Sequence, residues 1–176
     1  METAPLRLKG FPRGAVAQAP FRELRREIEE FHAEYCYVLD NNEIEAWPQF
    51  FAEDAVYRIT ARENVEADLP VGLVYCEGLA MIKDRAFAIA HTAMFDPRYL
   101  QHMVSNIRVT EATPSGEVSA EANYLVLQTL IDEDTRILQA GRYFDRFLRA
   151  RGRLLLKERH CVYDTLRIDN SLVYPV

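Results

Sequence analysis

The chain has 176 residues, of which 49% are hydrophobic and 27% are charged, a composition typical of one globular domain with a substantial core. Its formal net charge of −6 argues against nucleic acid or an anionic membrane as a partner, because such partners bind a surplus of basic residues. No apolar run approaches the roughly 20 residues that cross a bilayer. The cysteines are odd in number and far apart, which favours a reducing, cytoplasmic location over a disulfide framework.

Residues 1–19 show no periodicity, and charged residues, glycines and prolines interrupt their apolar positions. They predict an extended N-terminal arm rather than a secretory signal. Residues 20–176 are expected to form one domain, which opens with a long helix. Apolar residues recur there every three or four positions from Phe21 to Val38, and "DNN" at 40–42 ends the pattern. A short helix is predicted in "EIEAWPQFF", where Pro48 limits its length.

The next segments predict a strand at 54–60, a loop at 61–72 and a helix at 78–91. Four long antiparallel strands are then expected at about 100–112, 117–131, 135–149 and 153–168, because "TPSGE", "DEDT" and "RARGR" separate them as turn signals. Strands of this length usually bend. The pattern therefore predicts an α+β fold, with a curved sheet that holds helices on its concave face.

Four histidines are the first candidates for chemistry. His32 lies among glutamates in the first helix and is expected to face solvent, and His91 suits the negative end of its helix dipole. His102 belongs to "QHMVSNIRV", where strand alternation would place His102, Asn106 and Arg108 on one face. We expect these three residues to serve packing and assembly rather than proton transfer, because a row of this kind needs hydrogen-bond partners.

The last strand carries ionisable side chains on both faces. One face would combine apolar residues with three titratable ones, namely Glu158, His160 and Asp164. The other would hold Arg153, Lys157 and Arg159, which suit solvent. If the first row points inward, burial would shift its pKa values toward acid–base use. If it points outward, it meets a neighbouring subunit or water, and the sequence leaves both possibilities open.

Metal and cofactor sites are not expected in this chain. His102, His160 and either Asp54 or Asp164 supply the residue types of a two-histidine-one-carboxylate iron site, but their spacing is not diagnostic. A Rieske cluster needs two cysteines and two histidines, usually as two closely spaced pairs, and only Cys161 has a histidine nearby.

Five segments, taken in order, resemble the small (β) subunits of aromatic-ring-hydroxylating dioxygenases of the Rieske non-haem iron class. They are "EAWPQFFAEDAVYRIT", "DRAFAIAH", "HMVSNIRV", "AGRYFDRF" and "LLLKERHCVYDT". The resemblance covers nearly all of residues 20–176. It implies a cone-shaped, strongly curved mixed sheet around helices, as in scytalone dehydratase and nuclear-transport-factor-like proteins. Family strand ends often read "LDQ" where this chain has "YDT" at 163–165, so the contacts of that stretch are not carried over.

The resemblance also implies a partner. In this family a large (α) subunit holds the 2Fe-2S Rieske cluster and the mononuclear non-haem iron, receives electrons from a reductase or ferredoxin, and joins the small subunit in an α3β3 hexamer. The small subunit is mainly structural and binds no cofactor. The segments "WPQFF", "ARENVEADLPVGLVYCEG" and "SLVYPV" most resemble oxygenases of aromatic carboxylates such as salicylate, terephthalate or halobenzoates.

Two other functions remain open at this point, because a fold does not decide a function. A stand-alone dehydratase or isomerase would place a general base inside the cone, and its catalytic residues would come from Asp54, Tyr57, His102 and His160. A cone that binds a small molecule without catalysis is the third possibility.

Overall fold

The computed structural model describes residues 21–92, 97–150, 152–168 and 172–176, so the predicted N-terminal arm lies outside the described residues. The elements in chain order are α1 (Arg22–Asp40), η2 (Trp47–Phe50), β1 (Phe51–Ala61), α2 (Arg62–Glu66), β2 (Val74–Glu77), α3 (Gly78–His91), β3 (Arg98–Ala112), β4 (Val118–Leu130), β5 (Arg136–Ala150) and β6 (Arg153–Tyr163). The six strands form one sheet in the order β2-β1-β6-β5-β4-β3.

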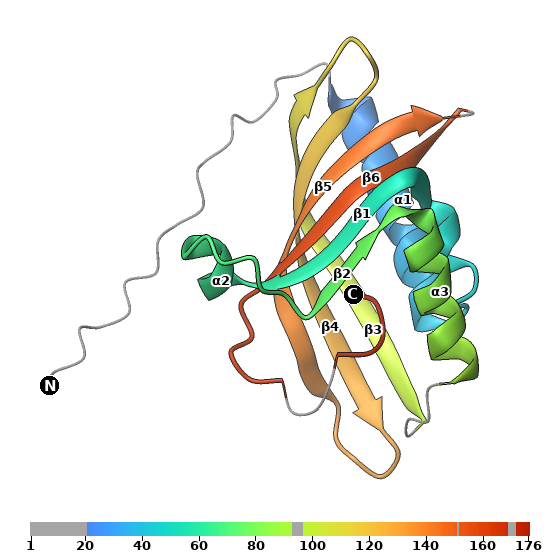
Figure 1. Ribbon diagram of the computed structural model, residues 1–176, viewed down its shortest axis with the longest axis vertical. Coiled ribbons are helices and arrows are strands. Elements are labelled where there is room, and N and C mark those ends of the chain that lie inside the picture. Colours follow the sequence, from blue (N-terminus) through green and yellow to red (C-terminus); the bar gives the residue numbers. More distant parts are fainter. Residues whose placement is uncertain (1–20, 93–96, 151, 169–171) are drawn as a thin grey trace, which may run out of the picture.

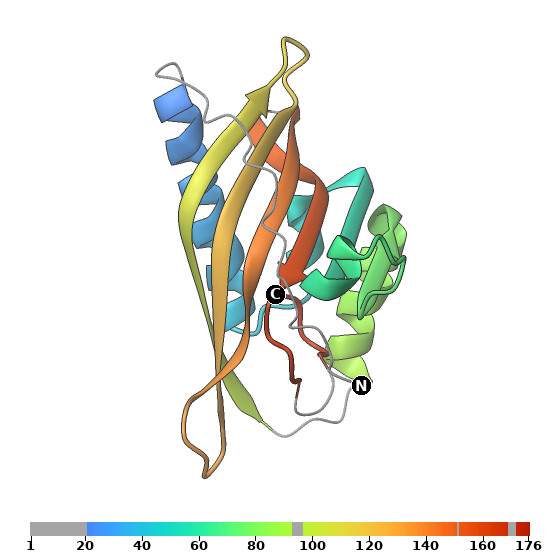
Figure 2. The ribbon, with the colours of Figure 1, turned by 90° about the vertical axis from the view of Figure 1, so that its left-hand side faces the viewer.

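The sheet is mixed and strongly curved. The β1–β6 pair is parallel, whereas all the other neighbours are antiparallel. The sheet is curved, α1 lies behind the strands in Figure 1, and α3 lies beside β1 and β2 (Figures 1 and 2). Helix α1 packs mainly on β3, and α3 packs on β1. The predicted α+β fold, a curved sheet with helices on its concave face, is confirmed.

Several boundaries differ from the prediction. Strand β1 begins at Phe51, the expected loop at 61–72 contains the short helix α2, and the short strand β2 follows that loop. Strand β2 is only 4 residues long, too short for its alternation to stand out in the sequence. Strand β6 ends at Tyr163 rather than near residue 168, because its parallel neighbour β1 also ends at that level, where Ala61 pairs with Tyr163. The expected short helix reduces to the single turn η2.

A β-bulge in β6 changes which residues face the core. Phe147 pairs with Leu156, whereas the adjacent Arg146 pairs with Glu158, so Lys157 is an extra residue in β6. Leu156 before the bulge and Arg159 after it are both buried. Because each residue of a regular strand points opposite to its neighbours, an inserted residue exchanges the two faces.

A second bulge does the same in β3. Ser105 pairs with Asn123 and Arg108 pairs with Glu121, which leaves three steps on β3 against two on β4. Asn106 lies at this bulge with φ 56°, a left-handed conformation that asparagine tolerates better than most residues. His102, which precedes the bulge, is buried, whereas Asn106 at the bulge is exposed. The prediction that His102, Asn106 and Arg108 share one face is wrong, because alternation does not continue through a bulge.

Candidate functional site

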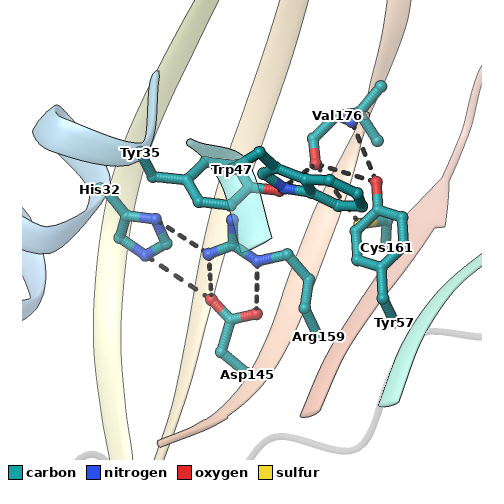
Figure 3. Close-up of polar contacts among 8 residues, drawn as sticks. All are labelled: His32, Tyr35, Trp47, Tyr57, Asp145, Arg159, Cys161 and Val176. Atoms are coloured by element: carbon teal, nitrogen blue, oxygen red, sulfur yellow. Dashed lines mark hydrogen bonds and ion pairs between the residues drawn. The ribbon is translucent and has the colours of Figure 1, made fainter. Parts of the chain in front are cut away.

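The last described residues, 172–176, pack against the core, and Val176 lies inside the cone (Figure 3). Val176 is fully buried, and its carbonyl oxygen accepts hydrogen bonds from the hydroxyls of Tyr35 at 3.2 Å and Tyr57 at 3.3 Å. The Cys161 thiol donates to the same oxygen at 3.9 Å, and the Val176 N–H donates to the Tyr57 hydroxyl at 3.0 Å. The Trp47 indole N–H donates to the Tyr35 hydroxyl at 2.8 Å. The segment is therefore held by a chain of hydrogen bonds at the centre of the fold.

Burial keeps these donors protonated. It raises the pKa of the Tyr35 hydroxyl, the Tyr57 hydroxyl and the Cys161 thiol, although the nearby Arg159 guanidinium opposes the rise at Tyr35 and Cys161. A neutral hydroxyl or thiol can donate to an oxygen, whereas its deprotonated form cannot. The interior therefore presents fixed donors to any oxygen placed there.

A histidine–aspartate pair lies beside this segment. The His102 Nδ1 atom is 2.6 Å from the Asp40 carboxylate, which also accepts the His102 backbone N–H at 3.0 Å. On the other side of the ring, Nε2 is 3.3 Å from the Pro175 carbonyl oxygen. Asp40 ends α1, so the pair ties that helix to β3. Both ring nitrogens of His102 are thus engaged within the protein.

A second buried network lies deeper in the cone (Figure 3). The Arg159 guanidinium makes two hydrogen bonds to the Asp145 carboxylate, at 2.9 and 2.7 Å, and one to His32 Nδ1 at 3.2 Å. The rings of Tyr35 and Tyr143 cover it, with centroids 4.2 and 4.1 Å from the guanidinium carbon. All three charged or titratable groups are almost fully buried. A buried cation of this kind is stable only when it is paired, as it is here.

Two expectations are therefore wrong, since His32 and Arg159 are buried rather than facing solvent. Burial lowers the pKa of His32 well below its ordinary value, and the Arg159 cation lowers it further, so the ring is neutral and Nδ1 can accept a hydrogen bond. Burial raises the pKa of Asp145, and the Arg159 guanidinium opposes that rise. A signal for His32 was present: Ile28, His32, Tyr35 and Leu39 follow helical spacing, and all four are buried.

The four candidates for a stand-alone enzyme do not meet at one place. Tyr57 and His102 both contact the last described residues from inside the cone. Asp54 is exposed, and His160 lies in an outer groove between β1, β6 and the α2–β2 loop. Asp40, Tyr35 and Arg159, which complete the interior, were not found from the sequence.

The ionisable row of the last strand faces outward. The Glu158 carboxylate accepts a hydrogen bond from Arg58 at 2.8 Å and lies 3.7 Å from Arg146, and the Asp164 carboxylate pairs with Arg62 at 3.2 Å. Partial burial lowers the pKa of His160 to about 4, and the neighbouring Arg58 cation adds to this effect. Among the described residues His160 Nε2 has no hydrogen-bond partner.

The residues do not fit an iron–sulfur cluster. Cys36, Cys76 and Cys161 are free and buried, and burial raises the pKa of each thiol, that of Cys36 to about 12. A thiol with a raised pKa is a poor metal ligand, because the thiolate is the species that binds. His160 and Cys161 are adjacent but face opposite sides of the sheet. Within the described ranges, no group of three or more His, Cys, Asp or Glu side chains could hold a metal ion, and no helix could span a membrane.

Comparison with known proteins identifies the family. Residues 34–170 match the family model of the ring-hydroxylating beta subunit. The anthranilate 1,2-dioxygenase small subunit of Burkholderia cepacia is 35% identical over 150 residues, which is 85% of this chain and 92% of that protein. The chain belongs to the family of ring-hydroxylating β subunits. The resemblance noted in the sequence is thereby confirmed.

Other relatives of this β subunit agree. The terephthalate 1,2-dioxygenase terminal oxygenase component subunit beta 1 of Comamonas sp. is 29% identical over 152 residues, covering 85% of this chain and 97% of that protein. A solved structure described as the β subunit of an aromatic-ring-hydroxylating dioxygenase from Novosphingobium aromaticivorans shares 37% identity, with a TM-score of 0.81, and the match covers 90% of this chain and all of that one.

A more distant structure shows the fold alone. A protein described as a scytalone dehydratase, also from Novosphingobium aromaticivorans, is 22% identical with a TM-score of 0.63, over 88% of this chain and 89% of that one. The predicted cone-shaped fold is confirmed.

Proposed function

We propose that this β subunit is a structural, non-catalytic component of an aromatic-ring-hydroxylating oxygenase. The observation that carries the proposal is the filled interior. Val176 occupies the centre of the cone, and the Arg159–Asp145 pair lies beneath it. A cone enzyme needs that space for its substrate, because a general base acts only within hydrogen-bond reach of the proton it removes.

One observation favours a second candidate, a stand-alone dehydratase or isomerase. The Asp40–His102 pair, in which the histidine is buried and the carboxylate partly exposed, has the arrangement of a general base and the carboxylate that orients it. In such an enzyme Nε2 of His102 would face the substrate. Here Nε2 faces the Pro175 carbonyl oxygen, so the pair supports the packing of α1, β3 and the last residues. This arrangement is why we prefer the structural role.

We infer that the partner is a large (α) subunit in an α3β3 hexamer in the cytoplasm. The α subunit would hold the 2Fe-2S Rieske cluster and the mononuclear iron, and a reductase or ferredoxin would act through it. The buried, protonated cysteines of this chain are consistent with that division. We further propose an aromatic carboxylate as the substrate of the complex, because anthranilate and terephthalate are the substrates named for two relatives.

The test is co-expression of this chain with the large subunit of the same oxygenase, followed by size-exclusion chromatography with light scattering. We expect one complex of three copies of each chain, with about two cluster irons and one mononuclear iron per α subunit. Oxidation of anthranilate or terephthalate should require the α subunit, and the isolated β subunit should turn over neither. A β subunit that remains separate, or that alone converts an aromatic substrate, would contradict the proposal.

A further inference from the structure

The stretch from residue 69 to residue 81 exposes several large apolar side chains. Five of them are between 45% and 61% exposed: Leu69, Val71, Leu73, Tyr75 and Met81. The first two line a groove of 520 Å³ beside α2 together with Tyr75, and the other three line a groove of 670 Å³ beside α3. Because Tyr75 belongs to both grooves, they adjoin along β2. We call this surface, made by the five side chains, the β2 strip. An apolar patch of this kind is typical of a place where another segment binds.

Strand β2 also has an unpaired edge. It is the outermost strand of the sheet and pairs only with β1. The Glu77 N–H donates not to β1 but to the Met81 sulfur at 3.4 Å, which is a weak acceptor. Alternate residues of an antiparallel strand point the same way, so the backbone N–H and C=O of Tyr75 also face the free edge. An extended segment along β2 would therefore meet main-chain donors and acceptors beside apolar side chains.

The charged groups at the β2 strip favour a basic segment. Asp68 lines the first groove and Glu77 ends β2. Both are exposed, and neither forms an ion pair among the described residues. The two cations that line the grooves are already engaged, because Arg58 pairs with Glu158 at 2.8 Å and Arg85 donates to a backbone carbonyl at 2.7 Å. The strip therefore presents unpaired negative charge beside its apolar side chains.

The N-terminal arm contains a segment with the complementary chemistry. The sequence "PLRLK" alternates apolar and basic residues. In an extended conformation Leu6 and Leu8 lie on one side of this segment, and the basic Arg7 and Lys9 lie on the other. Residues 5–13 include three basic residues and no acidic one, although the net charge of the chain is −6.

The arm is long enough to reach the strip from the start of α1. Helix α1 packs on β3, and β2 is the opposite edge of a six-stranded sheet, about 24 Å away at a strand spacing of about 4.8 Å. The 19 residues of α1 span about 28 Å. A path that covers both the width of the sheet and the length of the helix is about 37 Å long. The chain from Lys9 to Phe21 can extend to about 40 Å, which covers that path.

We propose that residues 5–9 of the N-terminal arm bind the β2 strip of the same chain as an added, extended segment. The two leucines cover the apolar side chains of the strip. Arg7 and Lys9 lie against its two unpaired carboxylates. The arm thereby covers the free edge of β2, which an unprotected sheet would offer to other chains. This inference concerns the β subunit by itself and does not depend on the oxygenase or its substrate.

The test is carbodiimide cross-linking of the full chain, which joins a lysine amine to a carboxylate only where the two groups touch. Lys9 is the single lysine of the arm. Lys157 Nζ lies 2.8 Å from the Glu117 carboxylate, so the product of that pair is an internal standard. A mixture of unlabelled and isotope-labelled chains separates products within one chain from products between chains. We expect peptide mapping to find Lys9 joined to Asp68 or Glu77 within one chain.

Matched variants show whether the apolar side chains hold the arm in place. Val71→Ser combined with Leu73→Ser leaves both carboxylates of the strip intact. The yield of the Lys9 product, relative to the standard, should fall at least about tenfold, because two apolar contacts are lost. Ile131→Ser combined with Ile137→Ser removes two other exposed apolar side chains and should leave the yield unchanged.

A variant of the arm tests the same contact without altering the folded domain. Leu6→Ser combined with Leu8→Ser should also lower the yield of the Lys9 product at least about tenfold. The standard should form as before. This variant decides the question even if the variant of the strip does not fold.

Four outcomes would overturn the inference. No Lys9 product while the standard forms, or equal reaction with remote exposed carboxylates such as Glu111 and Asp134, would mean that the arm does not bind the strip. A product found only between chains would mean that the arm binds a neighbouring copy. An unchanged yield in the serine variants of the strip and of the arm would mean that charge alone brings the groups together.

Discussion

A histidine on the inner face of the sheet and a histidine on its outer face have different surroundings. On the inner face, His102 has a partner for each ring nitrogen, and its side chain is fully buried. On the outer face, His160 is half-buried beside Arg58, and its Nε2 has no partner among the described residues. Inside the cone His102 is thus fully engaged, whereas on the outer face His160 has a ring nitrogen left for water or another chain. This difference agrees with the proposed structural role, in which the interior stabilises the fold and the surface contacts other chains.

The first and largest test of the comparison removes a charge from the inner face. Asp145→Ala leaves the buried Arg159 guanidinium without its carboxylate, and we expect the free energy of unfolding to fall by about 3–5 kcal/mol. Urea denaturation at pH 7 measures this change. The matched control is Glu27→Ala, which removes the partner of Arg149 from a similar two-bond pair at the surface. It should cost at most about 1 kcal/mol. An equal decrease in the free energy of unfolding for the two variants would show that the buried pair contributes no more to stability than the surface pair.

The second test asks whether His102 supports packing or chemistry. In the co-expressed oxygenase, His102→Ala should lower stability or assembly by about 1–3 kcal/mol, because Asp40 and Pro175 lose a hydrogen-bond partner. Turnover per assembled complex should stay close to that of the unaltered protein. Loss of a general base would instead slow turnover by about 10²–10⁴-fold with assembly intact. His91→Ala is the control, since His91 is an exposed histidine that also pairs with a carboxylate, that of Glu45.

The third test uses pH to sharpen the contrast at the outer face. The pKa of His160 is about 4 in the folded protein, below the ordinary value near 6.5, so the unfolded chain binds more protons between those two pH values. Stability should therefore fall as the pH drops from 6.5 to 4. Because His160 is partly exposed, its share should be about 1–2 kcal/mol after allowance for solvent screening.

Urea denaturation of the unaltered protein and of His160→Gln across this range isolates that share. His32 also has a lowered pKa, but it is present in both proteins and cancels in the difference. An identical pH dependence for the two proteins would contradict the expected role of His160.

The smallest effect is expected at the bulge that assigns residues of β3 to the two faces. Asn106 has φ 56°, so Asn106→Gly should raise the free energy of unfolding by about 0.5–1 kcal/mol, because glycine adopts this conformation without a steric cost. Asn106→Val should lower it by about 1–2 kcal/mol, since a β-branched residue fits this conformation poorly. Thermal unfolding of both variants measures the pair. The reverse order of stabilities would show that the bulge is not retained.

The sequence by itself determined the fold class, the long first helix, the helix at 78–91 and the four long antiparallel strands. These depend on local periodicity, and the structure places them within a few residues of the prediction. The family could also be identified from segments that occur in a fixed order, because such segments can be recognised without knowing which side of the sheet each residue faces.

Only the tertiary structure decided which side chains meet inside the cone. One extra residue, Lys157, reverses the faces of β6 and buries Arg159, and the bulge at Asn106 separates His102 from Arg108. Alternation in a sequence assumes a regular strand, so a bulge that forms through pairing with a neighbour cannot be seen in it. The position of Val176 depends on contacts with residues as many as 141 positions away, and no local pattern encodes such contacts.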